Sequence, residues 1–337
     1  MVYLCVTISV LSTYLIISNK DIIARILKIY DNPNSERKLH IEPVPAIGGT
    51  ALIFTLIVFY FLSIVLDITN LLIYSNSIIF FIISYLIGLF DDKQKLYINY
   101  RIILIIINYF LILSIEPSLL ITKIYINNPN LVIQVDNFLI SLIITIFCIF
   151  LLYNSINFLD GVNGNLILLT IYWIIIFFVK SNLFSNLALI TVSSLIICLI
   201  HNLRNKIFMG NSGSLLISSI IAYLFLLSHG NEYRVFFSDE IVVLFLIPGL
   251  DIMRLFFLRL KNKRSPFDGD QNHLHHLLLR KYKKNRIFIY YLIISVIPYG
   301  LYTLLNINIF LLITIILIYY LFLIKLLSGF SYNNKIL

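Results

Sequence analysis

Long apolar stretches, separated by short polar segments, recur along the whole chain of 337 residues. We count eleven, each of roughly 17 to 22 residues, which is long enough for a helix to cross about 30 Å of hydrocarbon at 1.5 Å per residue. They are centred near residues 10, 57, 82, 110, 145, 171, 192, 221, 247, 295 and 317. The pattern predicts an all-α integral membrane protein, a polytopic bundle of about eleven transmembrane helices.

The composition agrees with this prediction. Hydrophobic residues make up 60% of the chain and charged residues 12%, whereas charged residues supply about a quarter of a typical soluble protein. No internal repeat, long linker or soluble segment interrupts the apolar stretches. We therefore expect a single integral membrane domain over residues 1–337.

The distribution of basic residues predicts how the chain is oriented. The first apolar run has no basic residue before it and is followed by Lys20, Arg25 and Lys28, which favours a retained span with an outer N-terminus over a cleaved signal peptide. If the spans alternate, all but three of the 25 lysines and arginines lie in or beside cytosolic segments, as the positive-inside rule requires. These segments are 19–46, 91–101, 154–165, 202–212, 254–287 and the tail after Lys325. The net charge of +9 follows mainly from this topology, so it indicates a lipid bilayer as partner and no nucleic acid.

The expected cytosolic segments contain five unusual polar strings, and most of the glycines lie in or near these segments. Glycine permits close approach of the backbone to a ligand, so this clustering favours a built site on one face of the membrane. The strings are RKLHIEPVPAIGG (37–49), GLFDDKQKL (88–96), NSINFLDGVNG (154–164), FMGNSGSLL (208–216) and PGLDIMRLFFLRLKNKRSPFDGDQNHLHHLLL (248–279).

Each string alone also has an ordinary interpretation. Asp91 and Asp92 form either a site for a divalent cation, which would offset their repulsion, or a solvated helix end balanced by lysines. The third string is either a turn or part of a site, and the fourth is either a plain helix start or a phosphate cradle. The histidines of the fifth form a surface cluster, a soft-metal site or a phosphate contact.

Taken in order, the five strings resemble the polyprenyl-phosphate N-acetylhexosamine-1-phosphate transferase family, glycosyltransferase family 4. The resemblance implies a glycosyl-1-phosphate transferase of the bacterial inner membrane with its active site on the cytosolic face. Such an enzyme transfers a sugar-1-phosphate from a UDP-sugar to undecaprenyl phosphate, releases UMP and uses Mg²⁺ or Mn²⁺. The last string lacks three consecutive histidines, so it resembles the branch that uses UDP-GlcNAc or another UDP-N-acetylhexosamine to initiate cell-surface polysaccharide synthesis.

The resemblance also implies roles for residues of this chain. The implied catalytic residues are Asp91, Asp92, Asp160, His273, His275 and His276. The implied metal ligands are Asp91, Asp92, Asn211 and Asp160. The implied substrate-binding residues are Lys38, His40, Asn157, Asn163, Phe208, Arg259 and Arg264.

Two positions depart from the family pattern. Asn211 stands where the family usually has an aspartate metal ligand, and Asn163 stands where an aspartate is common. An amide carbonyl can coordinate Mg²⁺ but brings no negative charge. The metal is then held more weakly, or another carboxylate such as Asp160 compensates.

Other functions stay open at this point. A phospho-MurNAc-pentapeptide transferase and a catalytically weak family member acting as a binding subunit are alternatives, and the resemblance leaves a homodimer open. A transporter or channel predicts ionisable residues in mid-membrane, but the predicted spans are nearly free of charge. Sequence does not choose between direct attack by the lipid phosphate and a phospho-enzyme intermediate.

Overall fold

The computed structural model describes residues 2–33, 42–65, 71–181, 185–229, 234–265 and 272–329. Lys38 and His40, two predicted substrate-binding residues, lie outside this described part of the chain. The described residues are mainly helical, with two short two-stranded sheets, which confirms the all-α class. The chain divides into two compact units, so the single membrane domain stays a prediction.

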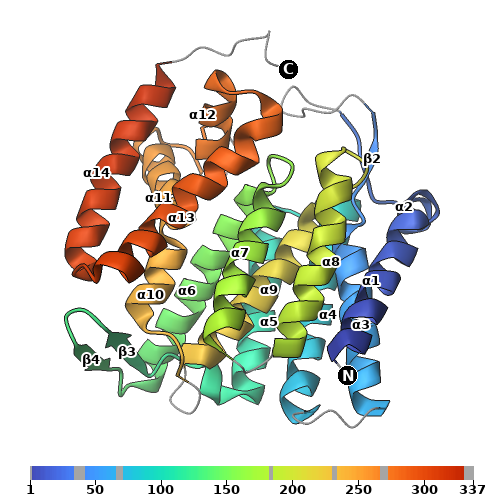
Figure 1. Ribbon diagram of the computed structural model, residues 1–337, viewed down its shortest axis with the longest axis horizontal. Coiled ribbons are helices and arrows are strands. Elements are labelled where there is room, and N and C mark those ends of the chain that lie inside the picture. The colour runs from blue at the N-terminus through green and yellow to red at the C-terminus, as the bar shows by residue number, and fades with distance from the viewer. Residues whose placement is uncertain are drawn as a thin grey trace. The chain divides into compact units, whose positions relative to one another are not determined.

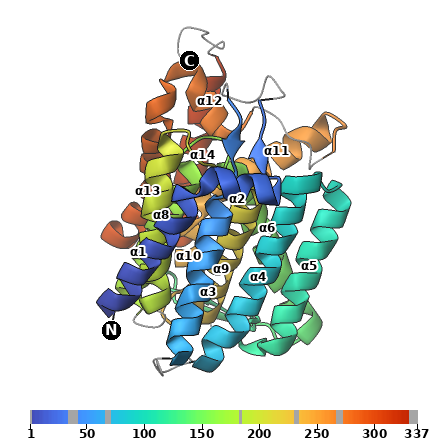
Figure 2. The ribbon, with the colours of Figure 1, turned by 90° about the vertical axis from the view of Figure 1, so that its right-hand side faces the viewer.

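The first unit contains Met1–Leu120 and Leu166–Val235. Its helices α3, α4 and α5 run side by side (Figure 2), and α9 packs mainly against α4 and α3. Its elements are α1 (Val2–Ser18), α2 (Lys20–Leu27), β1 (Tyr30–Asp31), β2 (Val44–Pro45), α3 (Gly48–Val65), α4 (Leu71–Gln94), α5 (Ile98–Ile115), the 3₁₀ turn η1 (Pro117–Leu119), α7 (Asn165–Lys180) without its first residue, α8 (Ser185–Leu203) and α9 (Gly210–His229).

Small and hydroxylated side chains join the helices of the first unit. Thr13 of α1 lies within hydrogen-bonding distance of Thr55 of α3, at 2.8 Å, and of Ser194 of α8, at 2.9 Å. On α4, Ser84 accepts a hydrogen bond from Asn108 of α5 at 2.8 Å. Between helices in a membrane, such contacts and close packing replace the hydrophobic driving force that acts in water.

The second unit contains Ile121–Asn165 and Phe236–Leu337. Helix α11 packs against α6 and α13, and α12 packs against α13 and α14 (Figure 1). The antiparallel strands β3 and β4 form a hairpin in which Lys123 pairs with Gln134. The elements are β3 (Lys123–Ile126), β4 (Leu131–Gln134), α6 (Phe138–Leu159), α10 (Ser238–Leu244), α11 (Leu246–Lys261), α12 (Leu274–Lys281), the 3₁₀ turn η2 (Lys284–Arg286), α13 (Ile287–Leu305) and α14 (Ile309–Ser328).

A buried carboxylate fixes the hairpin of the second unit. Oδ2 of Asp239, in α10, accepts hydrogen bonds from the Tyr302 hydroxyl at 2.8 Å and from the Asn127 N–H at 3.1 Å. Asp239 is 3% exposed, so these donors replace the water that Oδ2 loses on burial, whereas the buried Oδ1 has no hydrogen-bond partner among the described residues.

Among the described residues, seven helices have the length and composition to cross a membrane, or up to nine if each of two bent helix pairs forms one span. The bent pairs are α1 with α2, at 69°, and α10 with α11, at 71°. At 16 residues, α7 reaches only about 24 Å. The protein is thus a multi-pass membrane protein, while the predicted count of about eleven spans is not confirmed.

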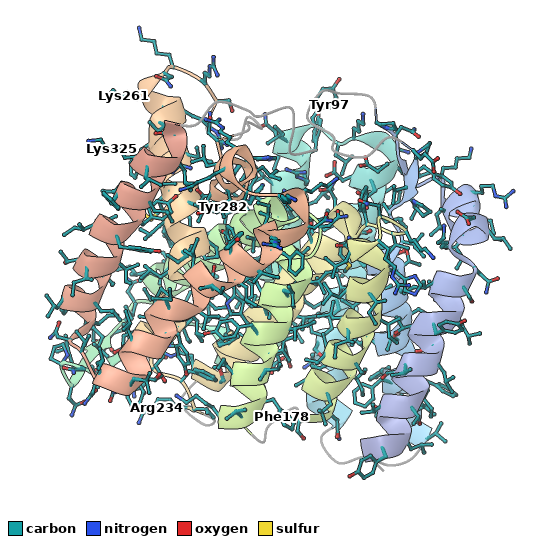
Figure 3. The ribbon with its side chains drawn as sticks, turned by 45° about the horizontal axis from the view of Figure 1, so that its top comes forward. Tyr97, Phe178, Arg234, Lys261, Tyr282 and Lys325 are labelled. Carbon is teal, nitrogen blue, oxygen red and sulfur yellow. The ribbon has the colours of Figure 1, made fainter. Side chains whose placement is uncertain are left out.

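Each unit has two distinct ends along its helices. Figure 3 shows Lys261 and Lys325 of the second unit at one end, and Tyr97 and Arg234 of the first unit at opposite ends. The alternation of spans across the membrane stays a prediction. Which end faces the cytosol stays a prediction.

Candidate active site

Asp92 lies in the last turn of α4 and contacts the first turn of α9. Its Oδ1 accepts a hydrogen bond from the Asn211 N–H at 2.8 Å, and its Oδ2 accepts one from the Ser212 N–H at 2.9 Å. The first N–H groups of a helix have no partner within it, and the helix dipole places partial positive charge there. Asp92 therefore caps α9 from a neighbouring helix.

Two glycines permit this contact. Gly88 lies one turn before Asp92, and a Cβ there would be 2.5 Å from the Asn211 carbonyl oxygen. Gly210 has φ of +71°, a conformation that favours glycine, and a Cβ there would be 2.7 Å from Asp92 Oδ2. The close approach of α4 and α9 depends on the absence of both side chains.

Burial raises the pKa of the Asp92 carboxyl to about 6, because the charged form loses water. The N–H donors of Ser212 and Asn211 oppose this shift, and the neighbouring Asp91 adds to it. A cation bound nearby would favour the ionised form. At pH 7 the carboxylate is therefore still mainly ionised, although its neutral form is more populated than in an exposed aspartate.

Asp91 has different partners. It is 4% exposed, and its Oδ2 accepts a hydrogen bond from Arg101 Nη1 at 2.8 Å, while its Oδ1 accepts one from the Leu96 N–H at 2.9 Å. In the described part of the chain, no group of three or more His, Cys, Asp or Glu residues is arranged to hold a metal. The metal-ligand set of Asp91, Asp92, Asn211 and Asp160 stays a prediction.

Phe208 directly precedes α9, and its backbone is tied to the start of α3. Its N–H donates to the Pro45 carbonyl at 2.9 Å, and its carbonyl accepts from the Gly48 N–H at 2.9 Å. The Phe208 side chain is half-buried. These bonds bring the end of the first string and the fourth string together within the first unit.

In the second unit, the turn after α6 carries Asn157, Asp160 and Asn163. Helix α6 ends at Leu159 with Asp160 as its C-cap, and the three polar side chains are half-buried. Gly161 lies close to α12. A Cβ atom built on Gly161 would be 2.5 Å from His275 Nε2. The structure thus brings the third string and the histidines together.

The three histidines form a cluster at the start of α12. The rings of His273 and His275 lie parallel with centroids 5.5 Å apart, and those of His275 and His276 are 4.3 Å apart. Burial, together with the nearby His276 and His273, lowers the pKa of His275 well below its usual value. His275 is therefore neutral at pH 7, and its Nε2 has no hydrogen-bond partner among the described residues.

Phe158 connects the histidines to the predicted basic residues. Its ring centroid is 4.4 Å from that of His273 and 5.6 Å from Cζ of Arg259, which is 6% exposed. Arg264 is exposed, and its N–H donates to the Arg259 carbonyl at 2.9 Å. The structure thus places Arg259, but not Arg264, in the buried part of this group.

Two charged residues that contact the predicted site residues were not predicted from the sequence. Arg101 forms an ion pair with Asp91, and Asp251 Oδ2 lies 3.0 Å from His273 Nδ1. A charged residue in or beside an apolar helix was the available signal for both.

Comparison with known protein families shows which family the chain resembles. Residues 74–229 match the model of Glycosyl transferase family 4, a segment that includes the end of α4 and the start of α9. Over this segment, a little less than half of the chain, the protein is similar to glycosyl transferase family 4. The family resemblance seen in the five strings is therefore confirmed.

Two curated relatives match about four-fifths of the chain, and a third matches less than half of it. It is 29% identical over 300 residues to the decaprenyl-phosphate N-acetylglucosaminephosphotransferase of Mycobacterium leprae, covering 79% of this chain and 74% of the relative. It is 28% identical over 279 residues to the undecaprenyl-phosphate alpha-N-acetylglucosaminyl 1-phosphate transferase of Thermotoga maritima, covering 81% and 80%. The enzyme of the same name from Escherichia coli K12 is 24% identical over 147 residues, or 41% and 40%. These names confirm the predicted enzyme class, glycosyl-1-phosphate transferases.

Gly161→Ala tests the contact between the turn after α6 and α12. Because the new methyl group would collide with His275 Nε2, we expect a loss of stability of about 1–3 kcal/mol, as for other overpacked sites. Turnover should fall at least about tenfold if His275 acts in the reaction. Thermal unfolding in detergent and product release measure the two effects. A variant with wild-type stability would show that the turn and α12 are not in contact.

Proposed function

We propose that this protein transfers GlcNAc-1-phosphate from UDP-GlcNAc to undecaprenyl phosphate, at the cytosolic face of the bacterial inner membrane, as the first step of a cell-surface polysaccharide. The observation that carries the proposal is the match of about four-fifths of the chain to relatives named as polyprenyl-phosphate N-acetylglucosamine phosphotransferases. The polar groups at the ends of otherwise apolar helices support it. A homodimer finds no support in the structure or the relatives.

In the proposed reaction, a phosphate oxygen of the lipid attacks the β-phosphorus of UDP-GlcNAc. The bond from that phosphorus to the bridging oxygen breaks, and UMP leaves with the oxygen. A phosphate monoester has its second pKa near about 6, so the attacking phosphate is largely a dianion at neutral pH. The protein then has mainly to position two anions and offset their repulsion.

The residues of the chain suit these tasks in different ways. In the first unit, the N–H groups at the start of α9 and Arg101 supply positive potential near Asp91 and Asp92. In the second unit, Arg259 supplies a fixed positive charge, and neutral His275 can donate or accept a hydrogen bond. We assign Arg259 and the histidines to the phosphates of the nucleotide and the sugar.

We also propose Mg²⁺ as the cofactor, with Mn²⁺ as a substitute. Asp91, Asp92 and Asn211 offer only oxygen donors, the type that Mg²⁺ prefers. Each carboxylate oxygen that accepts one N–H keeps a further lone pair for a cation. When bound, the metal would offset the negative charge of the phosphates.

The experiment is UMP release by the purified protein in detergent. The reaction mixtures combine undecaprenyl or decaprenyl phosphate with UDP-GlcNAc or UDP-MurNAc-pentapeptide, each with Mg²⁺ or with a chelator. We expect release with UDP-GlcNAc that requires both the lipid phosphate and Mg²⁺. Release only with the pentapeptide nucleotide would replace the proposed donor, and no release with any mixture would leave a binding subunit as the function.

Asn211→Asp tests whether position 211 holds a metal. A third carboxylate beside Asp91 and Asp92 should lower the Mg²⁺ concentration for half-maximal UMP release by about tenfold, because added ligand charge strengthens binding of hard cations. Without metal, the new charge should repel Asp92 and lower the thermal midpoint. The matched control is Asn108→Asp in α5, away from the start of α9. Unchanged Mg²⁺ dependence of Asn211→Asp would remove residue 211 from the metal ligands.

A further inference from the structure

Asp251 is a buried carboxylate near the middle of α11, with four donor groups around it. It is 3% exposed. One oxygen, Oδ1, accepts hydrogen bonds from the Tyr320 hydroxyl at 2.7 Å and from Arg254 Nη2 at 2.8 Å. The Leu274 N–H, at the start of α12, lies 3.1 Å from the same oxygen. The fourth group is His273, whose Nδ1 lies 3.0 Å from Oδ2.

These donors define the state of the carboxylate and of the histidine. A guanidinium, a hydroxyl, an N–H and an imidazole all favour the ionised form of Asp251. Because an ionised carboxylate only accepts, the hydrogen of the His273 ring that faces it must lie on Nδ1. The neutral ring then has its free lone pair on Nε2, and the protonated ring has a second donor there.

The position of the His273 ring is fixed from other sides as well. Its ring lies against Phe158, with centroids 4.4 Å apart, and parallel to the ring of His275. Nε2 is buried and has no hydrogen-bond partner among the described residues. Arg254 also donates to the Asn272 carbonyl, so the Asp251 group holds the backbone directly before His273 as well as its side chain.

We propose that Asp251 is a positioning residue for the transfer reaction: it holds His273 with one hydrogen on Nδ1, so that Nε2 of the protonated ring donates a hydrogen bond to a phosphate oxygen of the substrate. The inference rests on the proposed function. In other enzymes a carboxylate orients a catalytic or metal-ligating histidine through the same kind of contact, and at metal sites its loss costs about 10- to 100-fold in metal affinity or activity. A purely structural role, in which Asp251 only ties α11 to α12 and α14, is the competing explanation.

Asp251→Asn tests the inference with Asp239→Asn as its matched control. Asp239 lies in the same unit, is equally buried and also accepts from a tyrosine hydroxyl, but none of its recorded hydrogen-bond partners is a predicted site residue. We expect kcat for UMP release to fall about 10- to 100-fold in Asp251→Asn, with less than about a threefold change in KM for UDP-GlcNAc. Asp239→Asn should keep kcat.

A double variant separates positioning from stability. If Asp251 acts through His273, Asp251→Asn combined with His273→Ala should have the kcat of His273→Ala alone, because coupled residues are not additive. The inference would be overturned if the kcat losses of the two single variants multiplied in the double variant. It would also be overturned if Asp251→Asn and Asp239→Asn lost the same kcat, or if Asp251→Asn kept the wild-type kcat.

A measurement without substrate keeps the inference distinct from the proposed function. In ¹⁵N-histidine NMR spectra of the protein in detergent, the His273 signals are assigned by their loss in His273→Ala. We expect the neutral ring to carry its hydrogen on Nδ1 in the wild type and to become a mixture of tautomers in Asp251→Asn. A hydrogen on Nε2 in the wild type would refute the pairing, whatever the activity. A wild type with the expected tautomer but no transferase activity would overturn the proposed function instead.

Discussion

Asp92→Asn should lower UMP release by about 100-fold or more, the largest effect of any single change at the start of α9. The variant loses the negative charge that faces the Asn211 and Ser212 N–H groups and that the proposed metal would bind. Removal of one such electrostatic contact from an active site costs on the order of 10²- to 10³-fold in turnover. Stability should also fall by about 1–2 kcal/mol, because both carboxylate oxygens accept an N–H and an amide has only one acceptor oxygen, so one N–H group loses its partner. UMP release and thermal unfolding measure the two losses.

The control for Asp92→Asn is Glu116→Gln in the same unit. Glu116 accepts a hydrogen bond from the Tyr223 hydroxyl at 3.0 Å, and it lies after the end of α5, which is the opposite end of that helix from the segment after Asp92. We expect Glu116→Gln to keep turnover within about threefold of the wild type, as for changes outside a site. If Asp92→Asn loses stability as expected but retains full activity, the carboxylate is a structural cap only.

Gly88→Ala should be the most damaging change that introduces no polar or charged group. Its Cβ would lie 2.5 Å from both the Asn211 carbonyl oxygen and Ser212 Cα, and 2.6 Å from the Ser212 nitrogen. These are backbone atoms of α9, which cannot rotate aside as a side chain can, so α4 and α9 must separate. We expect a stability loss of about 1–3 kcal/mol. Since a displacement of about 1 Å can cost about 100-fold in rate, turnover should fall by a similar factor.

Gly300→Ala in α13 is the matched control for Gly88→Ala. A Cβ at Gly300 would meet no atom within 4 Å, and alanine favours a helix over glycine by about 1 kcal/mol. The control should therefore be as stable as the wild type or slightly more so, with normal turnover. Equal behaviour of the two variants would show that α4 and α9 are not in close contact at residue 88.

The apolar stretches predicted the fold class because a membrane-spanning helix is encoded locally, by length and composition. The count of spans was less predictable. The bends of 69° and 71° turn two apolar stretches into paired shorter helices, and their angles depend on packing that the sequence pattern does not express. The apolar stretch near residue 171 was also predicted to be a spanning helix, but its helix α7 has only 16 residues.

The five polar strings predicted which residues lie at the site, but not the residues with which they form hydrogen bonds. Asp92 was predicted as a metal ligand, whereas its cap of α9 depends on residues more than a hundred positions away. Asp251 stood inside the fifth string without being selected, because its significance comes from His273, Arg254 and Tyr320 together. Such tertiary hydrogen bonds leave no periodic signal, and only charge within an apolar helix indicates them.

The burial of α9 also bears on how the chain enters the membrane. This helix has the lowest mean hydropathy of the seven candidate spans, 1.6, and 83% of the residues in its most apolar stretch are buried inside the protein. Its serines and glycines suit packing against α3 and α4 better than contact with lipid. Both partners precede α9 in the chain, so they are synthesised first, and we expect α9 to depend on them for stable membrane integration during synthesis.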